Sequence, residues 1–192
     1  MELIQNTPEL SAYLAASDVI DHEHPLVRTV AATLRADASD AYTYAKAAFE
    51  FVRDTIPHSH DIGDPRVTWR ASDVLEQGTG ICYAKAHALV ALLRAEGIPA
   101  GLCYQKFDVV HGLIAVRLPG EERWARQDPR GNKVDVDAQF RIDREQLAFL
   151  IRPEFNEVDW PVLFAEPHPA VLQCLQEAVD EPHLWQTLPT EL

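Results

Sequence analysis

The sequence predicts an α+β fold in which one central helix packs on a small antiparallel β-sheet, with additional helices at both ends of the chain. Three observations lead to this expectation. Residues 82–96 are apolar on most sides, as in a buried helix. Segments before them show helical periodicity, and segments after them alternate between apolar and polar residues with period two.

The first part of the chain predicts helices. Residues 1–37 predict two short ones, because Thr7-Pro8 resembles a cap followed by a first-turn proline. Residues 40–54 predict a third helix, and residues 55–69, rich in Pro, Gly, Asp and His, predict a loop. The apolar stripes are formed by Leu26, Val27, Val30, Ala31 and Leu34, and then by Ala45, Ala48, Phe49 and Val52.

The central helix is predicted from Cys82 to Glu96. Gly97 is a suitable residue to end it, and Pro99 prevents its continuation. One stripe consists of Cys82, Ala86, Leu89, Val90 and Leu93, and a second face holds only small residues. A helix of this kind is expected in the middle of the fold, covered on all sides.

Strands are predicted next, over residues 101–107, 109–118 and 123–128, with a further short strand near 133–140. The tail from residue 143 mixes short helices and loops, and Val171, Leu172 and Leu175 indicate a final amphipathic helix. No repeat or long linker divides the chain. We therefore expect a single domain over residues 1–192, with a core at about 40–140.

Composition excludes several classes of protein. The 192 residues carry a net charge of −13, which disfavours nucleic acid and anionic membranes as partners. No apolar run approaches the ~20 residues of a membrane span, and the start lacks a signal peptide, so we expect a cytoplasmic location. The three cysteines are far apart and form no C-x-x-C, which indicates neither disulfides nor zinc. No cofactor is indicated, and the oligomeric state is left open.

Cys82 is placed for reactivity, because a helix N-terminus stabilises a thiolate through its partial positive charge and free N–H groups. Gly78 and Gly80 precede it, so the backbone can turn sharply there, and the N–H of Cys82 could face an oxyanion. Cys103 lies in a predicted strand and Cys174 in a predicted apolar helix. Only Cys82 is therefore a candidate nucleophile.

A nucleophilic cysteine needs a base and a group that orients it. His87 is five residues from Cys82, roughly 140° around the helix axis, and points away. His111 begins the strand "HGLIAV", and Asp128 ends the strand "RWARQD". If the connecting turn has two or four loop residues, these two side chains share one face of the sheet; a three-residue loop without a bulge would separate them.

The stretch "GTGICYAKAHALVALLRAEGIPAG", followed by "HGLIAV" and "QDPRGNK", resembles the transglutaminase-like superfamily, in particular its small bacterial members. The resemblance covers roughly residues 40–140. It implies a papain-like core and a triad for acyl transfer through a thioester. Cys82 is then the nucleophile, His111 the general base and acid, and Asp128 the residue that fixes the imidazole. The substrates implied are peptides, proteins or small amides.

The chain departs from the family in three respects. Gly112 and Leu113 follow His111, where many relatives have an aromatic residue. The extra β-domains of calcium-dependent animal transglutaminases are absent. The Arg-Gly-Gly approach to the cysteine of arylamine acetyltransferases is absent too. Protein cross-linking of the animal type is therefore not implied.

Two other functions stay open. A catalytically retired fold could serve as a binding or scaffold protein, although an intact triad argues against this. A metal-dependent hydrolase could use His58 and His60, which would share a face of an extended "HSHD" segment. In the triad hypothesis, His60 or Trp69 could supply a second oxyanion donor or an aromatic wall of the cleft; a tryptophan that simply packs the loop is the ordinary alternative.

Overall fold

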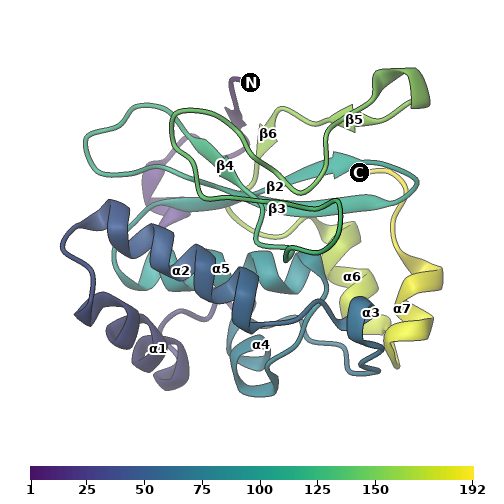
Figure 1. The fold of residues 1–192 in the computed structure, drawn as a ribbon, viewed down its shortest axis with the longest axis horizontal. Coiled ribbons are helices and arrows are strands. Elements are labelled where there is room, and N and C mark those ends of the chain that lie inside the picture. Colours follow the sequence, from purple (N-terminus) through teal and green to yellow (C-terminus); the bar gives the residue numbers. More distant parts are fainter.

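The computed structural model describes all 192 residues, and helices cover one side of an antiparallel sheet (Figure 1). The helices are α1 (Pro25–Ala36), α2 (Ala41–Thr55), α3 (Ser59–Ile62), α4 (Ala71–Gln77), α5 (Cys82–Ala95), α6 (Pro169–Glu177) and α7 (Glu181–Thr187). Short 3-10 turns lie at Leu10–Tyr13 and Pro153–Phe155. None of the helices combines the length and apolar character that crossing a membrane requires.

The main sheet has the strand order β4-β3-β2-β5, with every neighbouring pair antiparallel. A second, two-stranded sheet pairs β1 with β6 in parallel. The strands are β1 (Ile4–Gln5), β2 (Ala100–Lys106), β3 (Val110–Val116), β4 (Ala125–Gln127), β5 (Val158–Asp159) and β6 (Val162–Leu163). The predicted α+β class, with a central helix on an antiparallel sheet, is confirmed.

Helix α5 lies between the other helices and the sheet, and residues 82–94 are all buried. Its apolar surroundings on every side explain why the sequence lacks a polar face there. The helix ends at Ala95, and Gly97 follows in the left-handed conformation (φ +69°), with its N–H donating to the Arg94 carbonyl. This is the stop that the sequence predicts.

The preceding helices begin where their sequences supply caps. Pro25 starts α1 in the first-turn position, and the His24 ring accepts the Leu26 N–H. Asp40 and Thr43 form a reciprocal capping box at the start of α2. These helices, with α4, cover the face of α5 that the sheet leaves open.

Several short elements differ from the sequence prediction. Thr7-Pro8 begins no α-helix, and residues 133–140 hold only an isolated Lys133–Val136 bridge. Helix α3 lies inside the predicted loop at 55–69, and the helix predicted as the last one, α6, is followed by α7. Strands β1, β5 and β6 were not expected. Each is two residues long and forms only because another strand offers its edge, so no period-two pattern marks it in the sequence.

The register between β3 and β4 is one of the two that the sequence analysis requires. Ile114 lies opposite Gln127, and Ala115 lies opposite Arg126. Continuing this ladder places Asp128 opposite Leu113, two residues from His111 and therefore on the same face. The two sequence segments thus bring the imidazole and the carboxylate into diagonal contact.

Gly112 allows the first turn of α5 to approach β3 very closely. A Cβ at this position would lie 2.6 Å from Cδ1 and 3.3 Å from Cα of Tyr83, which is the residue after Cys82. The Tyr83 hydroxyl donates to the Val110 carbonyl and ties the same two elements together. The packing of Tyr83 on Gly112 therefore fixes the distance between the neighbouring residues, Cys82 and His111.

The Gly112→Ala substitution tests this packing. The added methyl group must displace Tyr83 or the start of α5, which we expect to cost about 1–3 kcal/mol of unfolding free energy in urea denaturation. Tyr83→Ala removes the ring that the methyl group meets, so the double variant should lose less than the sum of the two single variants. Strictly additive losses would show that Gly112 and Tyr83 do not limit the approach.

Candidate active site

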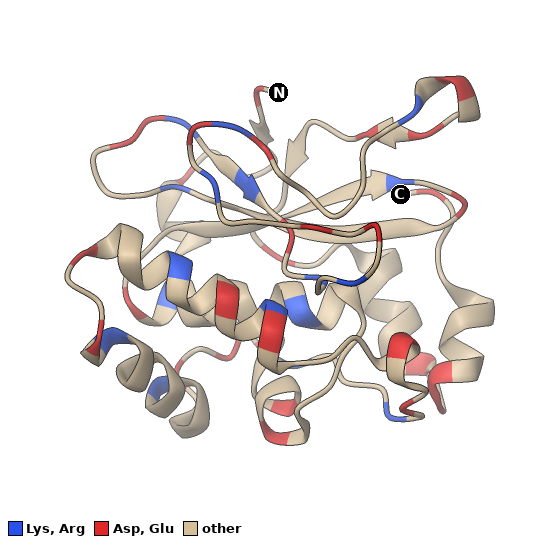
Figure 2. Cartoon of the chain, viewed as in Figure 1, with Lys and Arg blue, Asp and Glu red and all other residues tan.

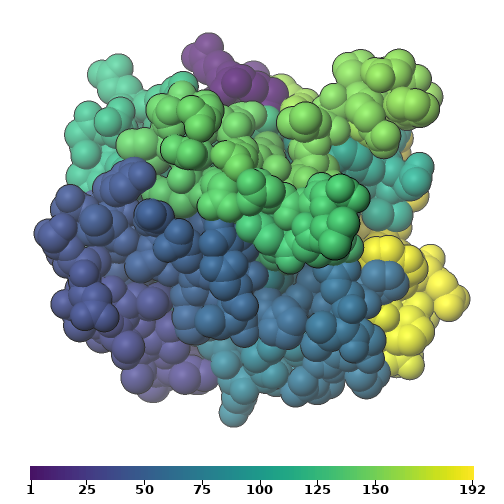
Figure 3. Space-filling model, viewed as in Figure 1, coloured from purple at the N-terminus to yellow at the C-terminus, as the bar shows by residue number.

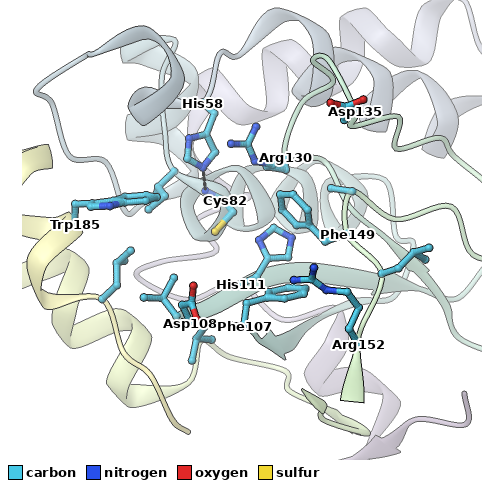
Figure 4. Close-up of a pocket in the computed structure, with 16 residues that line it drawn as sticks. His58, Cys82, Phe107, Asp108, His111, Arg130, Asp135, Phe149, Arg152 and Trp185 are labelled. Carbon is cyan, nitrogen blue, oxygen red and sulfur yellow. Dashed lines mark hydrogen bonds between the residues drawn. The ribbon is translucent and has the colours of Figure 1, made fainter. Parts of the chain in front are cut away.

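Cys82 opens into a cavity at the start of α5 (Figure 4). Helix α4 ends at Gln77, Gly78 follows in the left-handed conformation (φ +64°) that suits glycine, and three further residues lead to the first turn of α5. The cavity has a volume of about 750 Å³, ample for a peptide side chain with its flanking backbone. It is lined by His58, Ile81, Cys82, Phe107, Asp108, Val109, Val110, His111, Arg130, Asp135, Ala148, Phe149, Leu150, Arg152, Trp185 and Leu188.

His111, from the start of β3, lies between Cys82 and Asp128. Its Nε2 is 2.8 Å from Oδ2 of Asp128, and Figure 4 shows the ring beside the Cys82 sulfur. With Nε2 donating to the carboxylate, Nδ1 is the nitrogen available to the thiol. Cys82 and His111 are each 6% exposed and Asp128 is fully buried, so the group is shielded from water except through the cavity.

Asp128 is held by its own backbone neighbours. Oδ1 accepts the Arg130 N–H at 3.1 Å, and Oδ2 accepts the Ala148 N–H at 3.1 Å in addition to the His111 ring. Burial by itself raises the pKa of Asp128, but the positive charge of His111 and these hydrogen bonds outweigh it and lower the pKa below its usual value. The carboxylate is therefore ionised and cannot rotate freely.

The ionised carboxylate keeps His111 charged. Burial lowers the pKa of the imidazole, but the charges of Asp128 and Cys82, with hydrogen bonds to both, raise it to about 10. At neutral pH the ring is an imidazolium beside the sulfur. This is the protonation state that a thiolate nucleophile requires of its partner.

A third side chain, His58, touches the nucleophile, and the sequence analysis gave it no role in this cluster. Its Nε2 is 3.2 Å from the backbone nitrogen of Cys82, which donates to it. His58 is 6% exposed, and its backbone pairs with Gly80 in an isolated bridge. Ile56 and His58 alternate as inward-facing, buried residues just before the chain turns into α3. This alternation is the only sequence signal that could have indicated the position of His58.

The structure places His60 and Trp69 outside the cavity lining. Helix α3 begins at Ser59, so helical rather than extended spacing separates His60 from His58. The His60 ring stacks on Trp185 with 3.7 Å between ring centroids, and its Nδ1 is 2.6 Å from Glu181. Trp69 packs against the main core, under the Arg70 guanidinium.

The two histidines of "HSHD" therefore face different neighbours. No group of three or more His, Cys, Asp or Glu side chains lies close enough together to hold a metal ion. His87 also lies apart, fully buried, with Nδ1 2.8 Å from the Trp69 carbonyl oxygen. The His87 ring thus points away from Cys82, as the helix geometry predicts.

Residues after the predicted core build the outer walls of the cavity. Phe149 stands edge-on to His111, with 5.2 Å between ring centroids, and Phe107 lies at 6.2 Å from the same ring. Trp185 and Leu188 come from the C-terminal segment, which Figure 3 shows at one end of the molecule. That segment is fixed beside the site because Val110 N–H donates to the Pro189 carbonyl at 2.8 Å.

Charged side chains surround the cavity without forming a basic face. Figure 2 shows acidic residues spread over helices and loops, with Lys and Arg between them. Arg130 forms a two-bond ion pair with Asp61, and Arg152 pairs with Glu157. The walls are mainly apolar, and the cations at the rim are already partnered.

The three thiols should differ sharply in reactivity. Burial raises the pKa of Cys103 and of Cys174 to about 12, so both are protonated at neutral pH, whereas Cys82 faces an imidazolium and an open cavity. We expect iodoacetamide at pH 7 to alkylate Cys82 first, and mass spectrometry of digested protein to locate the label there. Cys82→Ala should abolish the fast phase. Equal, slow labelling of all three would contradict this account.

Comparison with known proteins agrees with the geometry. Residues 28–129 match the transglutaminase-like superfamily, whereas no curated protein sequence matches the chain. A candidate cysteine protease from Cytophaga hutchinsonii has a similar structure, with a TM-score of 0.54 and 19% identity over 65% of this chain and 43% of that one. The periplasmic domain of TgpA from Pseudomonas aeruginosa, bound to ethylmercury, gives a TM-score of 0.49 and 20% identity over 61% of this chain and 46% of that one.

The chain thus spans less than half the length of each of these two structures, and at such identities the likeness concerns the fold. The matched family range, by contrast, covers more than half of this sequence and includes Cys82, His111 and Asp128. It stops before Phe149, Leu150, Trp185 and Leu188, which form part of the cavity walls. The chain belongs to the transglutaminase-like superfamily.

Proposed function

We propose that this protein is a cysteine-dependent acyl-transfer enzyme acting on amides or esters of peptides, proteins or small molecules. The observation that carries the proposal is the position of His111, which binds the buried Asp128 carboxylate through Nε2 and faces the Cys82 sulfur with its other side. A cysteine nucleophile, an imidazole and a carboxylate, placed side by side in this order, are the groups that acyl transfer through a thioester requires.

The proposed reaction has two stages. The Cys82 sulfur attacks the carbonyl carbon, and the His111 imidazolium gives its proton to the leaving amine as the carbon–nitrogen bond breaks. The thioester then reacts with water or a second amine, from which neutral His111 removes a proton. Release of the acid or new amide restores the free thiolate and the imidazolium. Asp128 keeps the ring oriented throughout.

The cavity suggests which acyl groups fit. Its apolar walls, Phe107, Phe149, Leu150, Trp185 and Leu188, favour an apolar acyl side chain, and Asp108 and Asp135, which also line the cavity, disfavour an acidic one. A cavity of about 750 Å³ has room for more than a small amide. We therefore favour peptide or protein donors with an apolar residue next to the scissile bond, with hydrolysis and transfer to an amine both possible chemically.

A scaffold role without catalysis is the alternative that the residues allow. Loss of any one of the three side chains would be the expected mark of such a protein, and all three are present with His111 and Asp128 in contact. The metal-dependent alternative has less support, because His58 and His60 diverge.

Substitution of each residue tests the proposal on a panel of glutaminyl, peptidyl and small-amide substrates, with and without a primary amine. Cys82→Ala and His111→Ala should abolish turnover, and Asp128→Asn should lower kcat by about 10²–10⁴-fold. Turnover that survives Cys82→Ala and is lost with a chelator would instead support the metal-dependent alternative. Binding of panel peptides without turnover in the wild type would support the scaffold.

The pH dependence follows from His111. Its pKa is raised to about 10, so the protonated ring that donates to the leaving amine persists through neutral pH and is lost above about pH 10. We expect kcat/KM on amides, which reports the free enzyme, to hold through pH 8–9 and to fall as pH passes 10. In Asp128→Asn the larger of the two charges that raise the pKa of His111 is gone, so the fall should begin at lower pH. A wild-type fall already complete at pH 8 would contradict the assignment.

A further inference from the structure

Two buried polar side chains that line the cavity, His58 and Arg130, are not used by the proposed triad, and only His58 contacts Cys82. His58 meets the backbone N–H of Cys82 through Nε2, at 3.2 Å, while its Nδ1 is buried without any hydrogen-bond partner. Buried polar atoms without a partner are uncommon and call for a reason. Here the imidazole lies next to the nucleophile, on the side of Cys82 opposite His111 (Figure 4).

The Cys82 N–H is the group expected to stabilise negative charge on the substrate. When the sulfur attacks a carbonyl, the oxygen becomes an anion close to the nucleophile, where the N–H of that same residue can donate to it. A second donor is needed from another part of the chain. His58 is the side chain whose polar atom lies within hydrogen-bond distance of the Cys82 nitrogen.

His58 is a neutral ring. Burial, followed by the positive charge of Arg130, lowers its pKa to about 2, so it carries a single proton at neutral pH. If that proton is on Nδ1, Nε2 accepts the Cys82 N–H and the Nδ1–H is left buried without an acceptor. If it is on Nε2, that N–H and the Cys82 N–H are two donors whose nitrogens lie 3.2 Å apart with no acceptor between them.

An oxyanion between the two nitrogens satisfies both donors at once. In the second tautomer the only unpaired group is the lone pair of Nδ1, and an acceptor atom left unpaired is better tolerated than an N–H. The two tautomers are therefore matched to the free enzyme and to the enzyme carrying a tetrahedral intermediate. Converting one to the other requires the proton shift between ring nitrogens and a small rotation of the imidazole, so that both N–H groups point at the incoming oxygen.

The backbone holds His58 in place for this role. The Ser59 N–H donates to the Gly80 carbonyl at 3.2 Å, which joins the segment to the loop before Cys82. The buried Lys85 ammonium donates to the Ile56 carbonyl, two residues before His58. Because Lys85 is on the first turn of α5, the same helix carries the nucleophile and fixes the histidine opposite it.

We propose that His58 is a catalytic residue whose Nε2–H and the Cys82 backbone N–H together form the oxyanion hole. The inference rests on the proposed acyl-transfer function, since the oxyanion arises only if Cys82 attacks a carbonyl. It assigns the second donor to His58, and not to His60 or Trp69.

The test compares two reagents that use the same sulfur differently. Acetyl-leucyl-leucinal, a peptide aldehyde, forms a hemithioacetal whose oxygen occupies the oxyanion position, whereas iodoacetamide is displaced at a saturated carbon and forms no oxyanion. Aldehyde affinity is measured by titration, and the alkylation rate of Cys82 by mass spectrometry. The variants are His58→Ala, His58→Gln and the distant, exposed His24→Ala as a matched control.

We expect His58→Ala to weaken aldehyde binding by about 10²–10³-fold, while the alkylation rate stays within about threefold of wild type. His58→Gln should recover part of the affinity, because its side-chain amide can donate from a similar position, and His24→Ala should match wild type. Urea unfolding of each variant establishes that it is folded; if His58→Ala is not, His58→Gln and His58→Leu provide the same comparison, with only the former able to donate.

Three results would overturn the inference without touching the proposed function: unchanged aldehyde affinity in His58→Ala, equal losses of aldehyde affinity and alkylation rate, or a wild type that is alkylated rapidly at Cys82 but does not bind the aldehyde. Failure of the proposed function looks different. In that case wild-type Cys82 would react no faster than Cys103 and Cys174, whatever stands at position 58.

Discussion

The close packing of the first turn of α5 on the start of β3 determines where every other part of the site lies. Gly112 has no side chain, so the Tyr83 ring and backbone occupy that space, and the residues on either side, Cys82 and His111, become neighbours. Helix α5 can be placed there because it is apolar on all sides and is enclosed by the other helices. Its N-terminus is then the one end that opens into the cavity.

From that contact the electrostatics of the site follow. The β3–β4 register brings Asp128 under His111, and backbone N–H groups of Arg130 and Ala148 hold the carboxylate ionised in a buried position. A buried negative charge is stable only with a positive partner, so the imidazole remains protonated. Burial alone would have left both groups neutral; paired, they give a charged acid next to a thiol. The packing therefore sets the positions of the three side chains, and these positions determine that Asp128 and His111 are ionised.

Much of this could be predicted from the sequence because it depends on strong local patterns. The uniform apolar character of residues 82–96 marks the central helix, and the alternation in "HGLIAV" and "RWARQD" marks strands whose register can have only a few values. Some of these registers place His111 and Asp128 on the same face of the sheet, and the others place them on opposite faces. The family resemblance added the roles of the three residues, and the matched range agrees with it.

The parts that could not be predicted depend on contacts between distant short segments. His58 faces Cys82 because the chain turns into α3 at the next residue, and the sequence "HSHD" reads equally well as an extended segment with His58 and His60 on one face. Trp185 and Leu188 line the cavity because the C-terminal segment is bound by Val110, a contact with no local signal. Two-residue strands such as β5 exist only through their partner's edge.

The most direct test of the account is the protonation state of His111 itself. Nitrogen NMR of protein labelled at its histidine rings, with His111→Gln used to assign the signal, reports whether one or both ring nitrogens carry a proton. We predict that at pH 8, where an ordinary histidine with a pKa near 6.5 is neutral, His111 carries protons on both nitrogens. A singly protonated His111 ring at pH 8, titrating together with the exposed histidines, would contradict it.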